Sequence, residues 1–284
     1  MSTDSLRSLL KTESPLVVPG SYDALSAALV QEQGFKAVLV SGYAVSASLL
    51  GRPDIDLYTQ SEMAAVCRHI CRRVRIPVMA DADNGYGNAL NVMRTVEELE
   101  QAGVASITLE DQLSPKRCPL LGKRAELASV PESVGKLRAA LTARRNPEML
   151  VIARTDATDL DEVMIRCRAY AEAGVDAIKL ISPALHSIED LRRIHRECEL
   201  PLIIASLGWA ASIDPKMLRG LVSLITHPIM PIASAAAALE SNLRTLKKGD
   251  YPTSLPVQPL TQSQMEQTLE MANIHELEDK FLPK

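Results

Sequence analysis

Two aspartates, Asp81 and Asp83, stand one residue apart after an apolar run, in the stretch MADADNGYGNA at residues 79–89. Residues one apart on a strand point to opposite faces, so at least one of the pair must lie where the strand breaks into the turn NGYG. Carboxylates held close together repel each other unless a cation neutralises them. The stretch therefore predicts a cation site. The alternative is a simple turn in which Asp83 or Asn84 caps the next helix.

Further polar residues follow other apolar runs at the same relative position. They are Ser41 and Gly42, Glu110 and Asp111, Arg154 and Asp156, and Ser206. In a parallel barrel such strand ends meet at one face, where the reactive groups gather. Because the acidic members offer oxygen ligands and the set has no histidine, we expect Mg²⁺, with Mn²⁺ possible, at a site that includes Asp81 and Asp83.

Arg154 follows the apolar stretch LVIA and should face the same group of carboxylates. A fixed guanidinium beside a metal binds a carboxylate or phosphonate in a bidentate manner and stabilises charge that develops on its oxygens. A salt bridge with Glu110 or Asp156 is the alternative role, and the two roles are compatible.

The longest polar loop, EDQLSPKRCPLLGKRAEL at residues 110–127, is expected to act as a lid over an anionic substrate. Its residues Lys116 and Arg117 precede Cys118, and neighbouring cations lower the pKa of a thiol. Cys118 is therefore a candidate proton donor or acceptor, whereas an inert surface cysteine is the alternative.

The elements that must position these residues form a repeat. Apolar strands alternate with amphipathic helices, and the helix-ending glycines Gly34, Gly103 and Gly174 recur about every 70 residues. Interleaving the segments gives eight strands whose nearly continuous apolar character is typical of a parallel sheet covered by helices. We predict a (β/α)8 barrel, with an open doubly wound sheet as the alternative. Residues 1–284 should form one barrel domain, with 250–284 as a C-terminal helical extension.

Composition restricts the class of protein. The formal net charge is -4 and hydrophobic residues make up 46% of the chain, which argues against a nucleic-acid-binding protein. No stretch is long and apolar enough for a signal peptide or a membrane span, so we expect a cytoplasmic protein with no membrane partner. The cysteines should be reduced, and the role of Cys67, His69 and Cys71 stays open between packing and a metal site.

The motifs resemble those of the isocitrate lyase and phosphoenolpyruvate mutase superfamily, most closely its 2-methylisocitrate lyase-like branch. PGSYDALSA, SGYAVSASLLGRPD, DADNGYGN, LEDQLSPKRC, VIARTDA and AGVDAI occur in family order over nearly the whole chain. The resemblance implies a Mg²⁺-dependent barrel that acts on 2-hydroxy or 2-oxo acids through a metal-bound enolate of pyruvate. It also implies a homotetramer in which the last barrel helix is exchanged between subunits.

The resemblance also implies roles for individual residues. Ser41 and Gly42 would bind the pyruvate carboxylate, and Asp54 would be the catalytic aspartate of the loop after the second strand. Asp81 would bind the metal directly, Asp83 and Glu110 would hold metal-bound waters, and Arg154 would bind substrate. The lyase loop pattern K-[KR]-C-G-H is matched by Lys116, Arg117 and Cys118, which would bind substrate and deliver the proton.

Departures from the lyase pattern affect the expected substrate. Pro119 and Leu120 replace Gly-His, Ile181 replaces a polar residue after the sixth strand, and ASLGW, which contains Trp209, replaces a motif with a carboxylate-binding asparagine. An apolar wall made by Ile181 and Trp209 disfavours a tricarboxylate and favours alkyl substituents. We therefore expect a carbon-carbon lyase acting on a substituted malate or a methylisocitrate-like acid.

Other functions remain open. The ending EDKFLPK resembles the phosphonate-processing branch, so phosphonopyruvate mutase or hydrolase is one alternative. Oxaloacetate decarboxylase is another, and a barrel that binds 2-oxo acids without turnover is a third.

Overall fold

The computed structural model describes residues 5–11, 15–117, 125–181, 183–249 and 254–283. Eight parallel strands form a closed barrel in chain order, with β1 paired to β8 through Leu16 and Leu224. The strands are β1 (Leu16–Ser21), β2 (Val38–Val40), β3 (Val78–Asp81), β4 (Ser106–Glu110), β5 (Leu150–Thr155), β6 (Ala177–Leu180), β7 (Leu202–Ala205) and β8 (Leu224–His227). The predicted (β/α)8 barrel is confirmed.

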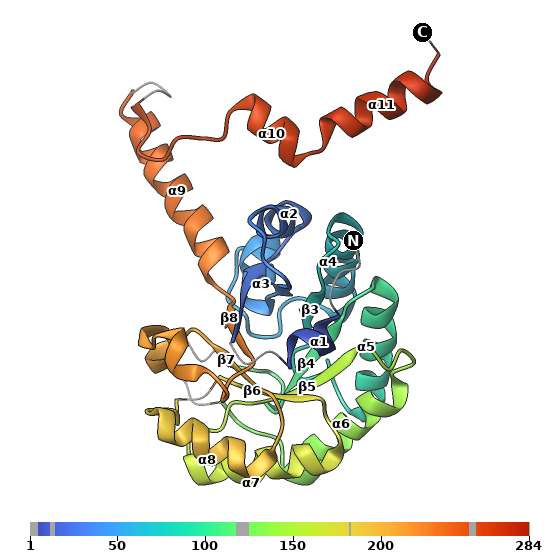
Figure 1. The fold of residues 1–284 in the computed structure, drawn as a ribbon, viewed down its shortest axis with the longest axis vertical. Helices are drawn as coiled ribbons and strands as arrows, with labels where there is room; N and C mark the ends of the chain where they lie inside the picture. The colour runs from blue at the N-terminus through green and yellow to red at the C-terminus, as the bar shows by residue number, and fades with distance from the viewer. Residues whose placement is uncertain (1–4, 12–14, 118–124, 182, 250–253, 284) are drawn as a thin grey trace. The chain divides into compact units, whose positions relative to one another are not determined.

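Helices pack around the outside of this barrel (Figure 1). They are α2 (Ala24–Glu32), α3 (Gly42–Leu50), α4 (Gln60–Arg73), α5 (Ala89–Ala102), α6 (Val130–Ala143), α7 (Leu160–Ala173) and α8 (Ile188–Cys198), with the 3-10 turns η2 (Gly208–Ser212) and η3 (Pro215–Leu218). The short α1 (Leu6–Leu9) instead packs its leucines against the core inside the barrel. Side chains of Ser, Thr, Asp or Asn cap the N-termini of α2 to α8, where they satisfy backbone N–H groups that have no intrahelical partner. Helices α5 and α7 end at Gly103 and Gly174, as the repeat predicted.

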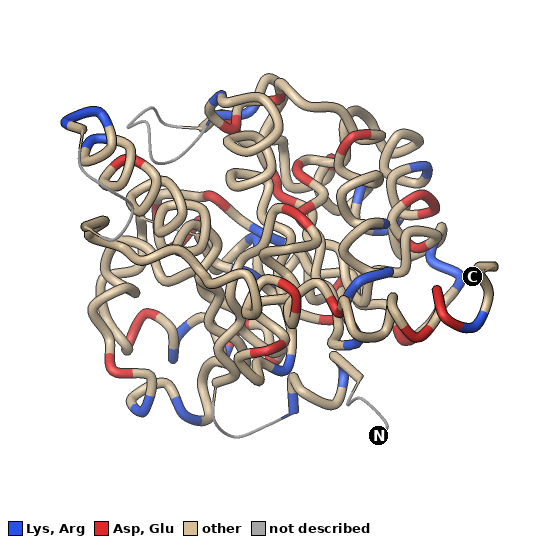
Figure 2. Tube along the Cα trace, turned by 90° about the horizontal axis from the view of Figure 1, so that it is seen from above, with Lys and Arg blue, Asp and Glu red and all other residues tan. Residues whose placement is uncertain are grey.

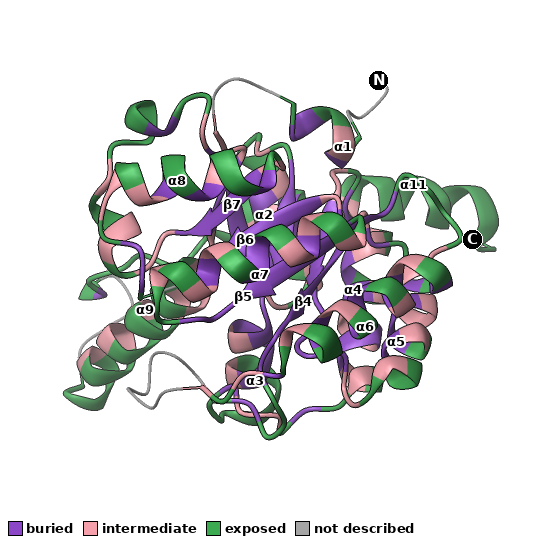
Figure 3. Cartoon of the chain, turned by 90° about the horizontal axis from the view of Figure 1, so that it is seen from below, coloured by how far each residue is buried: buried purple, intermediate pink, exposed green. Residues whose placement is uncertain are grey.

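The strands are apolar on both faces because each face meets a separate core. Side chains such as Leu39, Met79, Ile152 and Ile203 fill the barrel interior. Their neighbours along the strands pack outward against the helices. Figure 3 shows this burial, with the strands buried and the outer helical faces exposed. The alternation decides which strand residues point towards the barrel axis, and so which ones build the site.

A second compact unit begins at Ile232, after the unit Met1–Pro231 that holds the barrel. It contains most of α9 (Met230–Lys247), then α10 (Gln262–Thr268) and α11 (Met271–Phe281). Glu270 adopts a left-handed backbone conformation with φ of 57° and separates α10 from α11. The prediction of a single domain with an extension at 250–284 stays a prediction.

Basic and acidic residues are interspersed along the described chain (Figure 2), in keeping with the small net charge. Among the described helices, none combines the length and the apolar character that a membrane crossing requires.

Candidate active site

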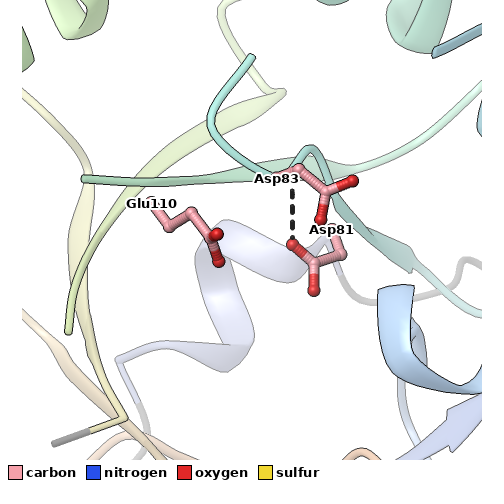
Figure 4. Close-up of side chains that lie close together, drawn as sticks. All are labelled: Asp81, Asp83 and Glu110. Carbon is pink, nitrogen blue, oxygen red and sulfur yellow. Dashed lines mark hydrogen bonds between the residues drawn. The ribbon is translucent and has the colours of Figure 1, made fainter. Parts of the chain in front are cut away.

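The carboxylates of Asp81, Asp83 and Glu110 form a buried group at the carboxyl ends of β3 and β4. One oxygen from each lies within 4.8 Å of the others. Strand β3 ends at Asp81, and Asp83 then adopts a left-handed conformation with φ of 47°, so the strand breaks between the two aspartates. The Asp83 backbone N–H donates a hydrogen bond of 3.3 Å to Asp81 Oδ1 (Figure 4). This break in the strand brings the carboxylates of both aspartates close to that of Glu110.

Two glycines leave room for this group. A Cβ atom on Gly42 would lie 2.6 Å from the Tyr58 hydroxyl and 3.2 Å from Asp81 Oδ2, so a larger residue would enter the carboxylate group. Gly85 follows the aspartates with φ of 88°, and a Cβ there would lie only 2.3 Å from Val92 Cγ2 on α5. Both positions therefore need glycine for the turn and the close packing.

The donor chemistry of this group fits a hard cation. Neither carboxylate oxygen of Glu110 accepts a hydrogen bond from a described residue, although both are buried. Burial raises the pKa of Glu110 well above its usual value, partly offset by Arg154. Three carboxylates with no nitrogen or sulfur ligand among them suit Mg²⁺ or Mn²⁺, whose charge would lower that pKa again.

Arg154 on β5 contacts three carboxylates. Its Nη1 lies 2.7 Å from Glu110 Oε2 and 4.0 Å from Asp81 Oδ2, and its Nη2 donates a hydrogen bond of 2.9 Å to Asp156 Oδ1. Both salt bridges that the sequence suggested as alternatives are present. The guanidinium is buried, since Arg154 is only 6% exposed. It connects the carboxylate group of Asp81, Asp83 and Glu110 to Asp156.

Asp111 is not part of the carboxylate group; it contacts the chain segment that carries Asp156. Its Oδ1 accepts the Asp156 backbone N–H at 3.0 Å, and its Oδ2 accepts the Tyr170 hydroxyl at 2.9 Å. Arg166 Nη1 lies 3.2 Å from the same Oδ2. Asp111 therefore fixes the segment that holds Arg154 in place.

Lys116 provides a second buried cation. Its Nζ lies 2.8 Å from Asp54 Oδ1 and forms a closer ion pair with Asp83 Oδ1. Burial raises the pKa of Asp54 to about 6, while Lys116 opposes the shift and Asp83 and Asp81 add to it. The Tyr58 hydroxyl donates a hydrogen bond of 2.6 Å to the other oxygen of Asp83. The structure thus brings Asp54 and Lys116 to the predicted metal ligands.

The remaining predicted residues are placed differently. Ser41 is buried and caps α3, accepting the Ala44 N–H at 3.4 Å, with Gly42 as the first residue of that helix. Arg117 is exposed, and its backbone N–H donates to Gln112 Oε1, so its side chain is not part of the buried group. Cys118, Pro119 and Leu120 lie outside the described residues.

The predicted apolar wall borders a cavity. Ile181 and Trp209 line a space of about 280 Å³ between the ends of β6 and β7, together with Leu185, Ala205 and Leu207. Its described lining residues are predominantly apolar, with His186 as a polar member, and none of them is an aspartate or a glutamate. Such a cavity suits alkyl groups better than a further carboxylate.

Sequence reasoning missed Lys179, a fully buried lysine in the middle of β6, 1% exposed. A charged residue inside the apolar run DAIKLI was a visible signal, because a lysine in a strand covered on both faces needs a polar environment. It also missed Tyr58, the hydrogen-bond donor to Asp83, for which no motif gave a signal.

A closed parallel barrel with buried carboxylates and fixed cations at the carboxyl ends of its strands defines a class of enzyme, the (β/α)8 barrels whose active sites lie at that end of the sheet. The chain belongs to the phosphoenolpyruvate phosphomutase family, whose model matches residues 6–247. The superfamily resemblance expected from the motifs is thereby confirmed.

Named relatives are similar over most of the chain. A 2,3-dimethylmalate lyase of Eubacterium barkeri is 39% identical over 283 residues, covering 97% of this chain and 96% of the relative. An oxaloacetate decarboxylase of Rhodopseudomonas palustris is 39% identical over 256 residues, covering 88% and 87%.

Solved structures agree with this assignment. A phosphoenolpyruvate phosphomutase from Streptomyces platensis subsp. rosaceus has a TM-score of 0.91 at 31% identity and covers 98% of each chain. A phosphonopyruvate hydrolase in complex with oxalate and Mg²⁺ has a TM-score of 0.86 at 26% identity and also covers 98% of each chain.

Proposed function

We propose that this protein is a Mg²⁺-dependent carbon-carbon lyase that cleaves a substituted malate or a methylisocitrate-like 2-hydroxy acid. The observation that carries the proposal is the buried group of Asp81, Asp83 and Glu110 beside Arg154. The similarity over 97% of the chain to a 2,3-dimethylmalate lyase supports the same reaction class. The oxalate and Mg²⁺ complex of the phosphonopyruvate hydrolase supports Mg²⁺ as the ion.

The metal would be held by Asp81, with Asp83 and Glu110 positioned to hold its waters. When bound, Mg²⁺ supplies a Lewis acid that polarises the oxygens of a 2-hydroxy or 2-oxo acid. Ser41 and the backbone at Gly42 are suited to bind the substrate carboxylate at the N-terminus of α3, where N–H groups and the helix dipole favour an anion.

In the proposed cleavage, the bond between the hydroxyl-bearing carbon and its neighbour breaks. The hydroxyl loses its proton and becomes the carbonyl of the 2-oxo acid product, and the bonding electrons pass to the neighbouring carbon. Arg154 stabilises the negative charge on the oxygens of the hydroxy acid as its hydroxyl loses the proton, and the Cys118 thiol gives its proton to the neighbouring carbon, which has taken the bonding electrons. Asp54 and Lys116 form a buried ion pair beside the site that is suited to hold the hydroxyl proton, and Arg117 precedes the thiol in the chain.

The test is a comparison of kcat/KM for 2,3-dimethylmalate, 2-methylisocitrate and isocitrate on one preparation. We expect the dimethylated substrate to be best and isocitrate to be worst, by on the order of tenfold per well-buried methylene. Highest activity on isocitrate would contradict the role of the cavity lined by Ile181 and Trp209. Cleavage that persists after complete removal of divalent ions would contradict the metal role.

The role of Cys118 has its own test. The substitution Cys118→Ser should abolish turnover, because a serine hydroxyl is far less acidic than a thiol, while binding of Mg²⁺ and pyruvate should remain intact. Cys71→Ser on α4 serves as the control variant, since burial raises the pKa of that thiol to about 11. Undiminished cleavage by the Cys118→Ser variant would remove this residue from the mechanism.

Oxaloacetate decarboxylation is the second candidate, favoured by the 39% identity to the Rhodopseudomonas palustris enzyme over 256 residues. It needs the same stabilisation of charge on oxo-acid oxygens but no proton from a thiol at the cleaved carbon. Release of CO₂ from oxaloacetate at a higher kcat/KM than cleavage of dimethylmalate would establish it. Phosphonopyruvate is tested as a further substrate on the same preparation. An unchanged ³¹P NMR spectrum would exclude phosphonate chemistry.

A barrel that binds 2-oxo acids without turnover remains the non-catalytic alternative. Calorimetry that finds Mg²⁺-dependent oxalate binding, together with no reaction across the whole panel, would support it over the lyase.

A further inference from the structure

Two of the three buried cations near the carboxylate group are already paired. Arg154 contacts Glu110 and Asp156 at 2.7 Å and 2.9 Å. Lys116 is paired with Asp54 and Asp83. Within the described part of the chain, Lys179 has no carboxylate oxygen within 4.0 Å of its Nζ. It is therefore the cation of the site that is available to an anionic ligand.

The strand places the Lys179 side chain inside the barrel. Ile178 and Leu180, its neighbours in β6, belong to the outer core between strands and helices, whereas Ala177 belongs to the inner core. By alternation Lys179 points inward, like Ala177. It pairs in register with Arg154 of β5, which in turn pairs with Glu110 of β4. The three residues thus stand side by side at one level of the barrel wall.

The charges that act on the ammonium show where it lies. They belong to Asp81, Glu110, Arg154 and Asp156, which all stand at the carboxyl ends of β3, β4 and β5. Burial lowers the pKa of Lys179 to about 8, while the three carboxylates raise it and Arg154 lowers it. A buried ammonium without a close partner is costly, and an oxyanion placed beside it would offset that cost.

The order of the strands around the barrel limits which anionic ligand could reach Lys179. In a closed barrel of eight, β2 and β6 lie on opposite sides of the axis, and β3 and β4 lie between them. A ligand whose first carboxylate lies at Ser41 and Gly42 after β2, beside the metal ligands of β3 and β4, extends across the mouth towards β6. A second carboxylate on the far end of that ligand would meet Lys179.

We propose that Lys179 is a substrate-binding residue that holds the second carboxylate of a four-carbon dicarboxylate. The inference deepens the proposed function, on which it rests for the position of the first carboxylate.

Malate and lactate form a matched pair of ligands for the test, because malate is lactate with a carboxylate in place of a methyl hydrogen. Their dissociation constants are measured by calorimetry with Mg²⁺ present, for the wild type, Lys179→Met and Lys179→Arg. We expect the wild type to prefer malate and Lys179→Met to lose about 10- to 100-fold in malate affinity, the effect of removing a hydrogen bond to a charged group. Lactate affinity should change less than about threefold. Lys179→Arg should recover part of the preference, and Lys216→Met, at an exposed lysine, should leave it unchanged.

Because the test measures binding of ligands that need not react, a failure of the lyase proposal leaves its result intact. An unchanged ratio of the malate and lactate constants in Lys179→Met would overturn the inference. The inference would also be overturned if the affinities for malate and lactate fell equally and the Mg²⁺ affinity changed. In that case Lys179 would only balance the charge of the metal ligands. Lys179→Gln, which keeps a polar side chain, provides the same comparison if the Met variant does not fold.

Discussion

Glu110 is the residue at which the carboxylate group and the guanidinium of Arg154 meet. Its buried oxygens accept no hydrogen bond from a described residue, and Oε2 forms an ion pair with Arg154 at 2.7 Å, so a metal ion would complete its environment. Replacing Glu110 with Gln removes the charge and keeps the shape. We expect the affinity for Mn²⁺, measured by electron paramagnetic resonance, to fall by about 10- to 100-fold, the usual effect of losing an outer-shell partner of a metal.

Glu189→Gln on the exposed face of α8 is the control for Glu110→Gln and should leave Mn²⁺ affinity unchanged. An equal Mn²⁺ affinity for wild type and Glu110→Gln would remove Glu110 from the metal site.

The affinity for malate should depend on pH through Lys179. Its pKa of about 8, lowered by burial, means that the ammonium is present below pH 8 and is lost as the pH rises through that value. Asp81, Glu110, Arg154 and Asp156 are the charged groups around it. We expect malate affinity to be constant from pH 6.5 to about 7.5 and then to fall by up to about tenfold per pH unit.

Lactate affinity should stay level over the same pH range, as should malate affinity in Lys179→Arg, because a guanidinium does not lose its proton there. A parallel fall for malate and lactate would assign the titration to the metal site instead.

Residue types and spacing were enough to predict that the carboxylates of Asp81, Asp83 and Glu110 meet, because all three follow apolar runs, but the same rule also selected Asp111. The sequence could not tell that Arg117 points away from the buried group while Lys116 points into it, since neighbouring loop residues carry no periodicity. It also could not separate the role of Asp111 from that of Glu110. That difference depends on the hydrogen bonds with Asp156 and Tyr170 from other elements.

The turn between β3 and α5 is the element that sets the geometry of the metal ligands. Gly85→Ala would place a methyl group 2.3 Å from Val92 and also force a left-handed backbone on alanine. We expect a loss of about 2–4 kcal/mol in the free energy of unfolding, from strain and overpacking together. Denaturant titration gives this value, and a weaker Mn²⁺ affinity should accompany it.

Gly34→Ala separates the two causes, because Gly34 has φ of 81° but no described atom lies within 4 Å of the place that a Cβ would take. This variant should lose only about 1 kcal/mol, the backbone cost alone. Equal losses for the two variants would show that the contact with Val92 does not matter.

At the level of elements, the eight strands were predictable because strands that face two cores carry continuous apolar runs. Three features were not. The helix α3 directly after β2, the 3-10 turns after β7 and the division of the C-terminal helix at Glu270 all depend on local backbone geometry rather than on periodicity. Lys179 lies beside Arg154 because of the register between β5 and β6, and register cannot be read from a single sequence.

For the whole molecule, we propose a homotetramer that exchanges its last barrel helix, as the family resemblance implies. The unit from Ile232 onward exposes Leu239, Leu243 and Leu246, which recur on α9 at spacings of four and three residues. Such a stripe is typical of a helix that packs against a partner. Sedimentation should give a mass about four times that of the chain, and Leu243→Glu should lower it, because a charge is costly in an apolar interface.

Ala237→Glu adds a charge on the opposite side of the same helix and should keep the assembly. A wild-type monomer at micromolar concentration would contradict the proposed tetramer.

The pairing of Leu16 with Leu224 has a consequence for the synthesis of the protein on the ribosome. The barrel cannot close until its last strand has left the exit tunnel, which follows the first strand by about 10–40 s at usual rates of translation. During that interval the inward carboxylates of β3 and β4 lack part of the opposite wall of the barrel. The growing chain therefore exposes its apolar strands without the help of ligand binding, and a chaperone that covers open sheet edges would act on it in this window.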